Sequence, residues 1–418
     1  MKRLVYVWKL ILLVFFIFVL YIDVLAWDNE VTHRDLSEYA AYSSILRPCN
    51  NAQDQNCDYL KNLGLDNGLL EVLEWNGNPT IKKDFIKEWL REGANLEDYA
   101  GPLGIGYFDG KARAFNHFHN PLKQAPWLDA GLDDWIVLPP FHVTGKSSLR
   151  WAQDGAYQEN FYEKDWSWNK TREHYYTGLT GKNFAGSEIA PDEATKKEYF
   201  ARTFRGLGHQ MHLIEDAAQP DHVRNDAHPE DSILKKNILN GSRYFETWAK
   251  EEDIRINSYA ANPIFPNVPL NVSYDNLAPI TQFIDAEQYN GASPSTSLTQ
   301  GIAEYANANF FSDDTIFAAE RYPTNDGHYF PFPRKESTDI QSFINGTKPI
   351  ETIINADGNT DTGIWISKLS DGEAVSHFVR TSSLTKIVYN LFGEGSLFYS
   401  TFFRDEECHK DYASLLIP

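Results

Sequence analysis

The chain contains 418 residues, which is enough for one large domain or two medium ones. Its formal net charge of −20 argues against a polyanionic partner, such as nucleic acid or a strongly anionic membrane, because the long-range interaction would be repulsive. With only three cysteines, a four-cysteine zinc site is excluded and disulfide bonds cannot be the main framework of the fold.

The N-terminal segment predicts a secretory signal peptide over residues 1–26. Two basic residues precede an apolar run from Leu10 to Tyr21, and the small-residue cleavage pattern Val24-Leu25-Ala26 follows. The mature chain, residues 27–418, would then be secreted or periplasmic in a bacterium. An uncleaved membrane anchor is the alternative, because the whole stretch is long enough to span a bilayer.

Helical periodicity of apolar residues marks five later segments. The longest of them begins with a proline followed by two acidic residues, which is typical of a helix start. The expected helices are Thr32–Leu46, Asp84–Gly93, Pro191–Asp216, Glu246–Ile254 and Thr296–Phe311.

The remaining segments are less regular. Residues 145–186 read as loop or broken helix, and residues 259–293 and 321–361 as irregular, turn-rich chain. Short alternating runs within residues 362–392 are consistent with a small β-hairpin. We therefore predict an all-α, multi-helix fold over residues 27–418, with irregular insertions and a small hairpin.

A histidine-rich segment, from Gly208 to His222, carries the strongest chemical signal. His212 and Asp216 are four residues apart, so on a helix they lie on the same side. Imidazole and carboxylate groups are common zinc ligands. Pro220 ends the helix and lets His222 fold back toward the same cavity. The alternative is a set of ordinary hydrogen-bonded or surface histidines.

Two further signals are weak when each is taken alone. The turn Asn116-His117-Phe118-His119-Asn120-Pro121 can present an imidazole rigidly, and the acid of Glu97-Asp98-Tyr99 could join it. Cleavage after Ala26 would leave Trp27 with a free α-amine six residues before His33, and an unprotonated amine can chelate zinc together with its own carbonyl.

Together and in this order, the three signals resemble the zinc-dependent phospholipase C family, which is related to the fungal single-strand nucleases. The resemblance covers roughly residues 27–311 and implies three zinc ions in a helical cleft. It implies Asp98, His117, His212 and Asp216 as ligands of the first ion. It implies the amine and carbonyl of Trp27, with His33 and a bridging Asp216, for the second ion, and His222, His228 and Glu246 for the third.

The chain departs from the family pattern at two places. The family spaces its last histidine and acid as His-x3-Glu or His-x3-Asp, whereas His228 precedes Glu246 by eighteen residues. Either the chain loops to bring these two together or the third site is altered. In relatives, residues similar to those from Asp411 onward begin a further apolar helix, so we expect a truncated C-terminal end.

The resemblance implies a phosphodiesterase in which zinc-activated water attacks phosphorus, with Asp98 as a catalytic base. Phospholipase C activity would release diacylglycerol and a phosphorylated head group. Glu30 and Tyr99 match an acid and a tyrosine of phosphatidylcholine-cleaving relatives, and such groups suit a quaternary ammonium. We expect Arg224 near the phosphate or in a surface salt bridge. His119 and His209 would orient ligands or waters.

Two alternatives remain open at the sequence level. A single-strand nuclease with the same metal ions would need aromatic stacking platforms, for which Trp151, Trp166 and Trp168 are candidates, but no basic groove is evident. A non-catalytic, secreted zinc-binding protein is the other alternative. The expected partner is phospholipid at a membrane surface, with no stable nucleic-acid partner and a monomeric chain.

Overall fold

The computed structural model describes residues 31–47, 59–76, 81–125, 127, 129–132, 135–138, 141–226, 245–251, 279–293, 301–354 and 358–416. The expected signal peptide, the expected ligands Trp27 and His228, and Glu30 lie outside these residues. Within them, no helix is both long enough and apolar enough to cross a membrane.

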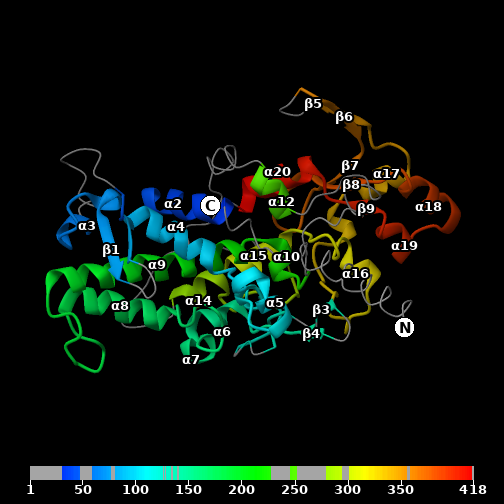
Figure 1. The fold of residues 1–418 in the computed structure, drawn as a ribbon. Coiled ribbons are helices and arrows are strands. Elements are labelled where there is room, and N and C mark those ends of the chain that lie inside the picture. The colour runs from blue at the N-terminus through cyan, green and yellow to red at the C-terminus, as the bar shows by residue number, and fades with distance from the viewer. Residues whose placement is uncertain are drawn as a thin grey trace, which may run out of the picture.

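Four helices form the part of the molecule that carries the expected ligands. The 25-residue α9 is central, α4 and α8 pack along it, and α2 packs against α4 and α9 (Figure 1). The side chain of Asp192 caps the start of α9 by accepting a hydrogen bond from the backbone N–H of Thr195. The bounds are Thr32–Ser43 for α2, Ile86–Leu96 for α4, Trp168–Thr180 for α8 and Glu193–Ala217 for α9.

Two glycines allow α4 and α9 to touch through their backbones. A Cβ atom added at Gly208 would lie 2.1 Å from the carbonyl oxygen of Leu90, and one added at Gly93 would lie 1.9 Å from that of Arg205. No side chain fits at either position. This close approach brings the C-terminal end of α4 against the face of α9 that carries His212.

Shorter helices surround this group. Near the end of α9 lie α10, α12, α14 and α15, and α20 packs against α12. The bounds are Tyr59–Asn62 (α3), Gly106–Asp109 (α5), Ser148–Gln153 (α6), Gly155–Gln158 (α7), Pro220–Val223 (α10), Phe245–Glu251 (α12), Pro279–Ile284 (α14), Ile302–Asn309 (α15), Ala318–Arg321 (α16), Ile340–Ile344 (α17), Thr385–Phe392 (α18), Ser396–Tyr399 (α19) and Glu406–Leu416 (α20). Single 3₁₀ turns lie at Gly68–Leu70 (η1), Pro102–Gly104 (η2), Arg113–Asn116 (η3) and Lys335–Ser337 (η4).

The strands form small antiparallel sheets. Among the described residues, three sheets are two-stranded, and a fourth has the order β7-β8-β9 with α20 packed against β8. The pairs are β1 (Val72–Asn76) with β2 (Ile81–Phe85), β3 (Trp135–Leu138) with β4 (Phe141–Val143), and β5 (Glu351–Ile354) with β6 (Thr360–Gly363). The three-stranded sheet contains β7 (Trp365–Lys368), β8 (Val375–Thr381) and β9 (Phe402–Phe403).

The prediction of a mostly helical chain is confirmed, but the strands were underestimated. The expected helix at 84–93 begins two residues later, because Asp84 and Phe85 complete β2 before α4 starts. Residues 145–186 contain three helices, including the 13-residue α8. The expected hairpin region holds most of a three-stranded sheet, and β1–β2 and β3–β4 are hairpins that the sequence did not predict.

The main hydrophobic cluster joins the end of α9 to the C-terminal sheet. It contains residues from Leu36 to Leu416. The rings of Phe311 and Phe378 lie 4.6 Å apart, and the hydroxyl of Tyr412 donates a hydrogen bond to the carbonyl oxygen of Phe378. The C-terminal region therefore packs directly on the helices that carry the expected ligands.

Candidate metal centre

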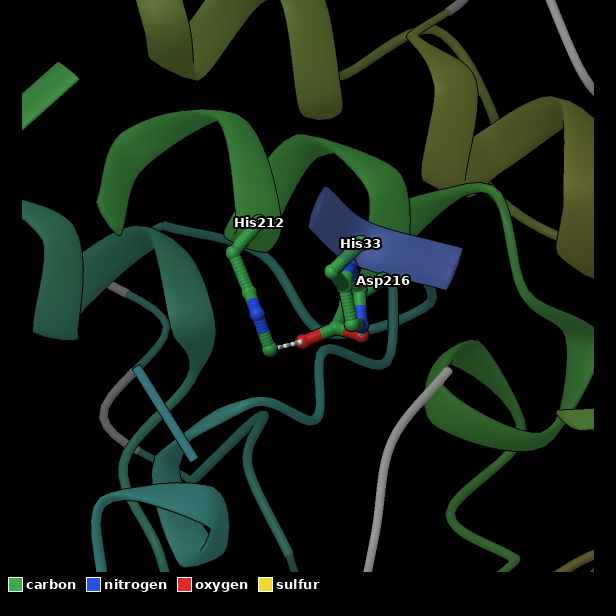
Figure 2. Close-up of side chains that lie close together, drawn as sticks. All are labelled: His33, His212 and Asp216. Atoms are coloured by element: carbon green, nitrogen blue, oxygen red, sulfur yellow. Dashed lines mark ion pairs between the residues drawn. The ribbon is translucent and has the colours of Figure 1, made fainter. Parts of the chain in front are cut away.

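Five of the residues expected as metal ligands meet in the interior. His212 and Asp216 lie one turn apart on α9, and His33 reaches them from α2, as Figure 2 shows. Asp98 follows the end of α4, and His117 follows η3. All five side chains are buried, at 2 % exposure or less. Helical spacing explains the pair on α9, whereas tertiary packing brings in the other three.

Asp216 is at the middle of this cluster. Its Oδ2 lies 2.9 Å from Nδ1 of His117 and 3.2 Å from Nε2 of His212, and its Oδ1 lies 3.4 Å from Nε2 of His33. Asp98 faces the same imidazoles, with Oδ1 3.2 Å from Nδ1 of His117 and Oδ2 3.6 Å from Nε2 of His212. The Asp216 carboxylate thus contacts His117 and His212 through one oxygen and His33 through the other.

The outer nitrogen of each of these histidines faces an oxygen. Nδ1 of His33 lies 2.6 Å from Oε2 of Glu215, and Nδ1 of His212 lies 2.6 Å from the carbonyl oxygen of Ala94. Nε2 of His117 lies 3.6 Å from Oε1 of Glu97. Hydrogen-bonded oxygens, such as those facing His33 and His212, fix the tautomer and orientation of histidines that bind metal through the other nitrogen. The 3.6 Å separation at His117 is longer than a hydrogen bond.

The inner atoms of the cluster fit a cation. Nδ1 of His117 and Nε2 of His212 lie 3.2 Å apart and face the same two carboxylates. Both carboxylate oxygens of Asp98 and of Asp216, and Nε2 of His33, are buried without a hydrogen-bond partner. Buried polar atoms are rarely left unpaired, because each costs about 1–3 kcal/mol or more. The described residues therefore include buried groups that could hold a metal ion, namely His33 with His212 and Asp216, and Asp98 with His117 and His212.

The electrostatics of the cluster also favour positive charge. Burial opposes protonation of His33, but the neighbouring carboxylates of Asp216 and Glu215 outweigh it and raise the pKa of His33 to about 10. Burial likewise opposes protonation of His117, yet the Asp216 and Asp98 carboxylates raise its pKa well above the usual range. Burial raises the pKa of Asp216, but His222, His212 and His117 hold it well below its ordinary value. A divalent cation would satisfy the same carboxylates without protons.

His222 and Glu246 form an extension of the cluster. Nε2 of His222, on α10, lies 3.2 Å from Oε1 of Glu246 on α12, and its Nδ1 lies 3.8 Å from Oδ1 of Asp216. The ring of Phe118 stacks on the His222 imidazole, with the centroids 4.7 Å apart and the planes 1° from parallel. Of the three ligands expected for a third ion, His222 and Glu246 lie within the described residues, and they are adjacent.

Two expected residues have other surroundings. Tyr99 is half-buried, and its ring makes an edge-to-face contact with Tyr162. Arg224 is fully buried and donates hydrogen bonds to Thr315 and to the carbonyl oxygens of Asn307 and Phe332. The expectation that Arg224 lies near the phosphate or in a surface salt bridge was therefore wrong. Its guanidinium makes its hydrogen bonds inside the protein core.

The aromatic platforms expected for a nuclease are mostly inside the protein. Trp151 is 0 % exposed and Trp166 is 6 % exposed. Trp166 stacks on His209, and Trp151 lies under the Arg113 guanidinium. These two indoles are core residues and cannot stack on bases, whereas the third candidate, Trp168, is half-buried.

Two other histidines lie behind the ligands. The backbone N–H of His119 donates to the carbonyl oxygen of His222, and its ring contacts Ser147 and Asp285. His209 contacts Glu97, the same carboxylate that faces His117, and burial lowers the pKa of His209 to about 3. His209 thus shares the Glu97 carboxylate with His117, and His119 contacts His222 through its backbone N–H.

Glu97 and Glu215 were not identified as functional from the sequence. Each directly precedes an expected ligand, and each contacts the outer nitrogen of a histidine. Glu215 is three residues after His212, so helical spacing alone indicates that it lies near the same face. For Glu97 no comparable signal exists, because its partners Arg113, His117 and His209 come from separate elements.

Comparisons of the chain with protein-family models, with curated proteins and with solved structures return no match. The cluster geometry is therefore the main support for a function.

Proposed function

We propose that this protein is a secreted, zinc-dependent phosphodiesterase with phospholipase C activity. The observation that carries the proposal is the buried convergence of three histidines and two aspartates, in which both aspartates and Nε2 of His33 lack a geometrically satisfied hydrogen bond. Nitrogen and carboxylate donors in this proportion are typical of zinc, and unprotected buried carboxylates are costly without a cation.

The proposed ligands divide among three zinc ions. Asp98, His117, His212 and Asp216 would hold the first ion. Asp216 and His33 would hold the second, with the amine and carbonyl of Trp27 completing it. His222 and Glu246 would hold the third, for which His228 is the remaining candidate.

The chemistry divides between the ions and the chain. When bound, such ions would lower the pKa of water toward about 7 and neutralise charge on a phosphoryl group. Asp98 is the group that we assign as proton acceptor, since its carboxylate oxygens have no hydrogen-bond partner. Glu215 and the carbonyl oxygen of Ala94 hold the His33 and His212 rings in orientation.

Two observations favour phospholipid over single-stranded nucleic acid. The net charge of −20 opposes long-range attraction of a polyanion, and Trp151 and Trp166 are too buried to stack on bases. The aromatic pair Tyr99 and Tyr162 offers a ring surface that suits a quaternary ammonium, and Glu30 would supply the matching carboxylate.

The test is a hydrolysis assay with purified, zinc-loaded protein. Phosphatidylcholine vesicles and single-stranded DNA are offered separately, each with and without a chelator. We expect chelator-sensitive release of phosphocholine and no cleavage of DNA. Cleavage of DNA alone would assign the centre to a nuclease, and activity on neither substrate by a protein that binds zinc would favour the non-catalytic alternative.

A further inference from the structure

The fully buried Arg404 connects the C-terminal region to the candidate metal centre. It lies between β9 and α20 and is 0 % exposed. Its NH2 group donates to Oδ1 of Asp221 at 2.7 Å, although the two residues are 183 positions apart in the chain. Asp221 is also 0 % exposed and directly precedes His222.

The other nitrogens of Arg404 are anchored away from the centre. Nε donates to Oδ1 of Asp313 at 2.8 Å, and NH1 donates to the carbonyl oxygen of Phe311 at 3.0 Å. An arginine guanidinium is planar and holds its donors in a fixed arrangement. Because two of its three nitrogens are held by residues 311 and 313, the third fixes the position of the Asp221 carboxylate.

The short helix α10 that carries His222 is also held by contacts from residues 118 and 119. The backbone N–H of His119 donates to the carbonyl oxygen of His222 at 3.0 Å, and Phe118 stacks on its imidazole. Residues 118 and 119 contact His222 itself, whereas Arg404 contacts Asp221, the residue that directly precedes His222. A four-residue helix has little stability of its own, so these contacts decide where the imidazole lies.

We propose that Arg404 is a positioning residue that holds His222 for cation binding through its ion pair with Asp221. The C-terminal region would then help to position a ligand of the proposed metal centre. This inference rests on the proposed function only in taking His222 and Glu246 as cation ligands. It requires no particular substrate.

The two carboxylates that share Arg404 provide a matched pair of variants. Asp221→Asn and Asp313→Asn each remove one buried negative charge from the same guanidinium, and each side chain is at most 7 % exposed. Both changes should lower the melting temperature, because a buried ion pair is broken. Only Asp221 adjoins a candidate ligand, so only Asp221→Asn should change cation binding.

The measurement is a titration of metal-free protein with Co²⁺, followed by calorimetry and by the visible absorption of the bound ion. For Asp221→Asn we expect one cation to bind about 10–100-fold more weakly than in the wild type, while the other cations bind as before. Asp313→Asn should keep wild-type affinities at every site. Equal cation affinities in the two variants would overturn the inference.

A conservative change at the arginine gives a second comparison if Asp221→Asn does not fold. Arg404→Lys keeps the buried positive charge but cannot reach Asp221, Asp313 and Phe311 together. It should weaken the same single cation, and wild-type affinity in this variant would contradict the proposal. Failure of the proposed function looks different, because a wild type that binds the cations but cleaves no phosphodiester leaves this inference intact.

Discussion

At the scale of single residues, two acidic residues that are neighbours in the sequence contact different nitrogens of the histidines. In both Glu97-Asp98 and Glu215-Asp216, the aspartate faces the inner nitrogens and the glutamate faces an outer one. The two oxygens of one carboxylate cannot reach both sides of an imidazole ring, so two neighbouring acids are needed. This arrangement leads to separate predictions for the two kinds of acid.

Replacing Glu215 should weaken metal binding without removing a ligand. Glu215→Gln keeps the size of the side chain but removes the charge that orients His33, and the affinity for zinc should fall about 10–100-fold. Calorimetric titration of metal-free protein measures this change. Glu193→Gln, at the exposed start of the same helix, is the control and should bind zinc as the wild type does. Equal affinities in the two variants would contradict the role of Glu215.

Replacing Asp98 should affect turnover most strongly. Asp98→Asn removes the proposed proton acceptor, so kcat for phosphatidylcholine hydrolysis should fall by about 10²–10⁴-fold. Steady-state kinetics measure the loss, and zinc content is determined in parallel. Asp66→Asn, at an exposed turn position, is the matched control. A variant that retains wild-type kcat would rule out Asp98 as the base.

The sequence predicted the buried His/Asp groups that could hold a metal ion better than it predicted the residues that support them. His212 and Asp216 follow from helical spacing, which is local. His33, Asp98 and His117 were expected from order and resemblance, and the structure brings them to the same place. The supporting Glu97 could not be found in this way, because an acid next to a ligand is normally solvated and only packing shows which way it points.

At the scale of elements, the centre depends on how closely two helices pack. The carbonyl oxygen of Ala94 lies within hydrogen-bond distance of Nδ1 of His212 because Gly93 and Gly208 let the backbones of α4 and α9 come into contact. No periodicity of apolar residues reveals such a contact, since glycine carries no side chain that marks a buried face. The hairpin β1–β2 was missed for a related reason, because β2 contains two lysines and an aspartate and runs directly into α4.

A methyl group at Gly208 should separate these helices. In Gly208→Ala the new Cβ would lie 2.1 Å from the carbonyl oxygen of Leu90 and 2.8 Å from the nitrogen of Ala94. The free energy of unfolding should fall by about 1–3 kcal/mol or more, and zinc affinity should fall with it. Thermal unfolding and zinc titration measure the two effects. Gly395→Ala, where a Cβ meets nothing within 4 Å, should leave zinc affinity unchanged.

At the scale of the whole molecule, ion pairs connect the C-terminal elements to one another. His377 on β8 lies 3.2 Å from Asp411 on α20 and 3.6 Å from Glu351 on β5. The hydrogen bond to Asp411 raises the pKa of His377, and Glu351 and Glu407 add to this while burial opposes it. The folded state therefore binds a proton at His377 more tightly than the unfolded state does.

This difference makes part of the stability depend on pH. A raised folded-state pKa gives stability that is fully present below the unfolded pKa of about 6.5 and is lost as pH rises through the folded value. His377→Gln should therefore destabilise the protein more at about pH 5.5 than at about pH 9. Urea unfolding of both proteins at the two pH values measures the effect. An equal loss of stability at both would show that the pairing carries no proton linkage.

The long separation between Asp221 and Arg404 also has a consequence for biosynthesis. Ribosomes extend a chain from its N-terminus at about 5–20 residues per second, so His33, His212 and His222 all emerge before the arginine that completes their surroundings. A nascent chain that stops short of residue 404 contains the ligands without their C-terminal anchor. Stable cation loading would then be a late event, which takes place only after residue 404 has been synthesised.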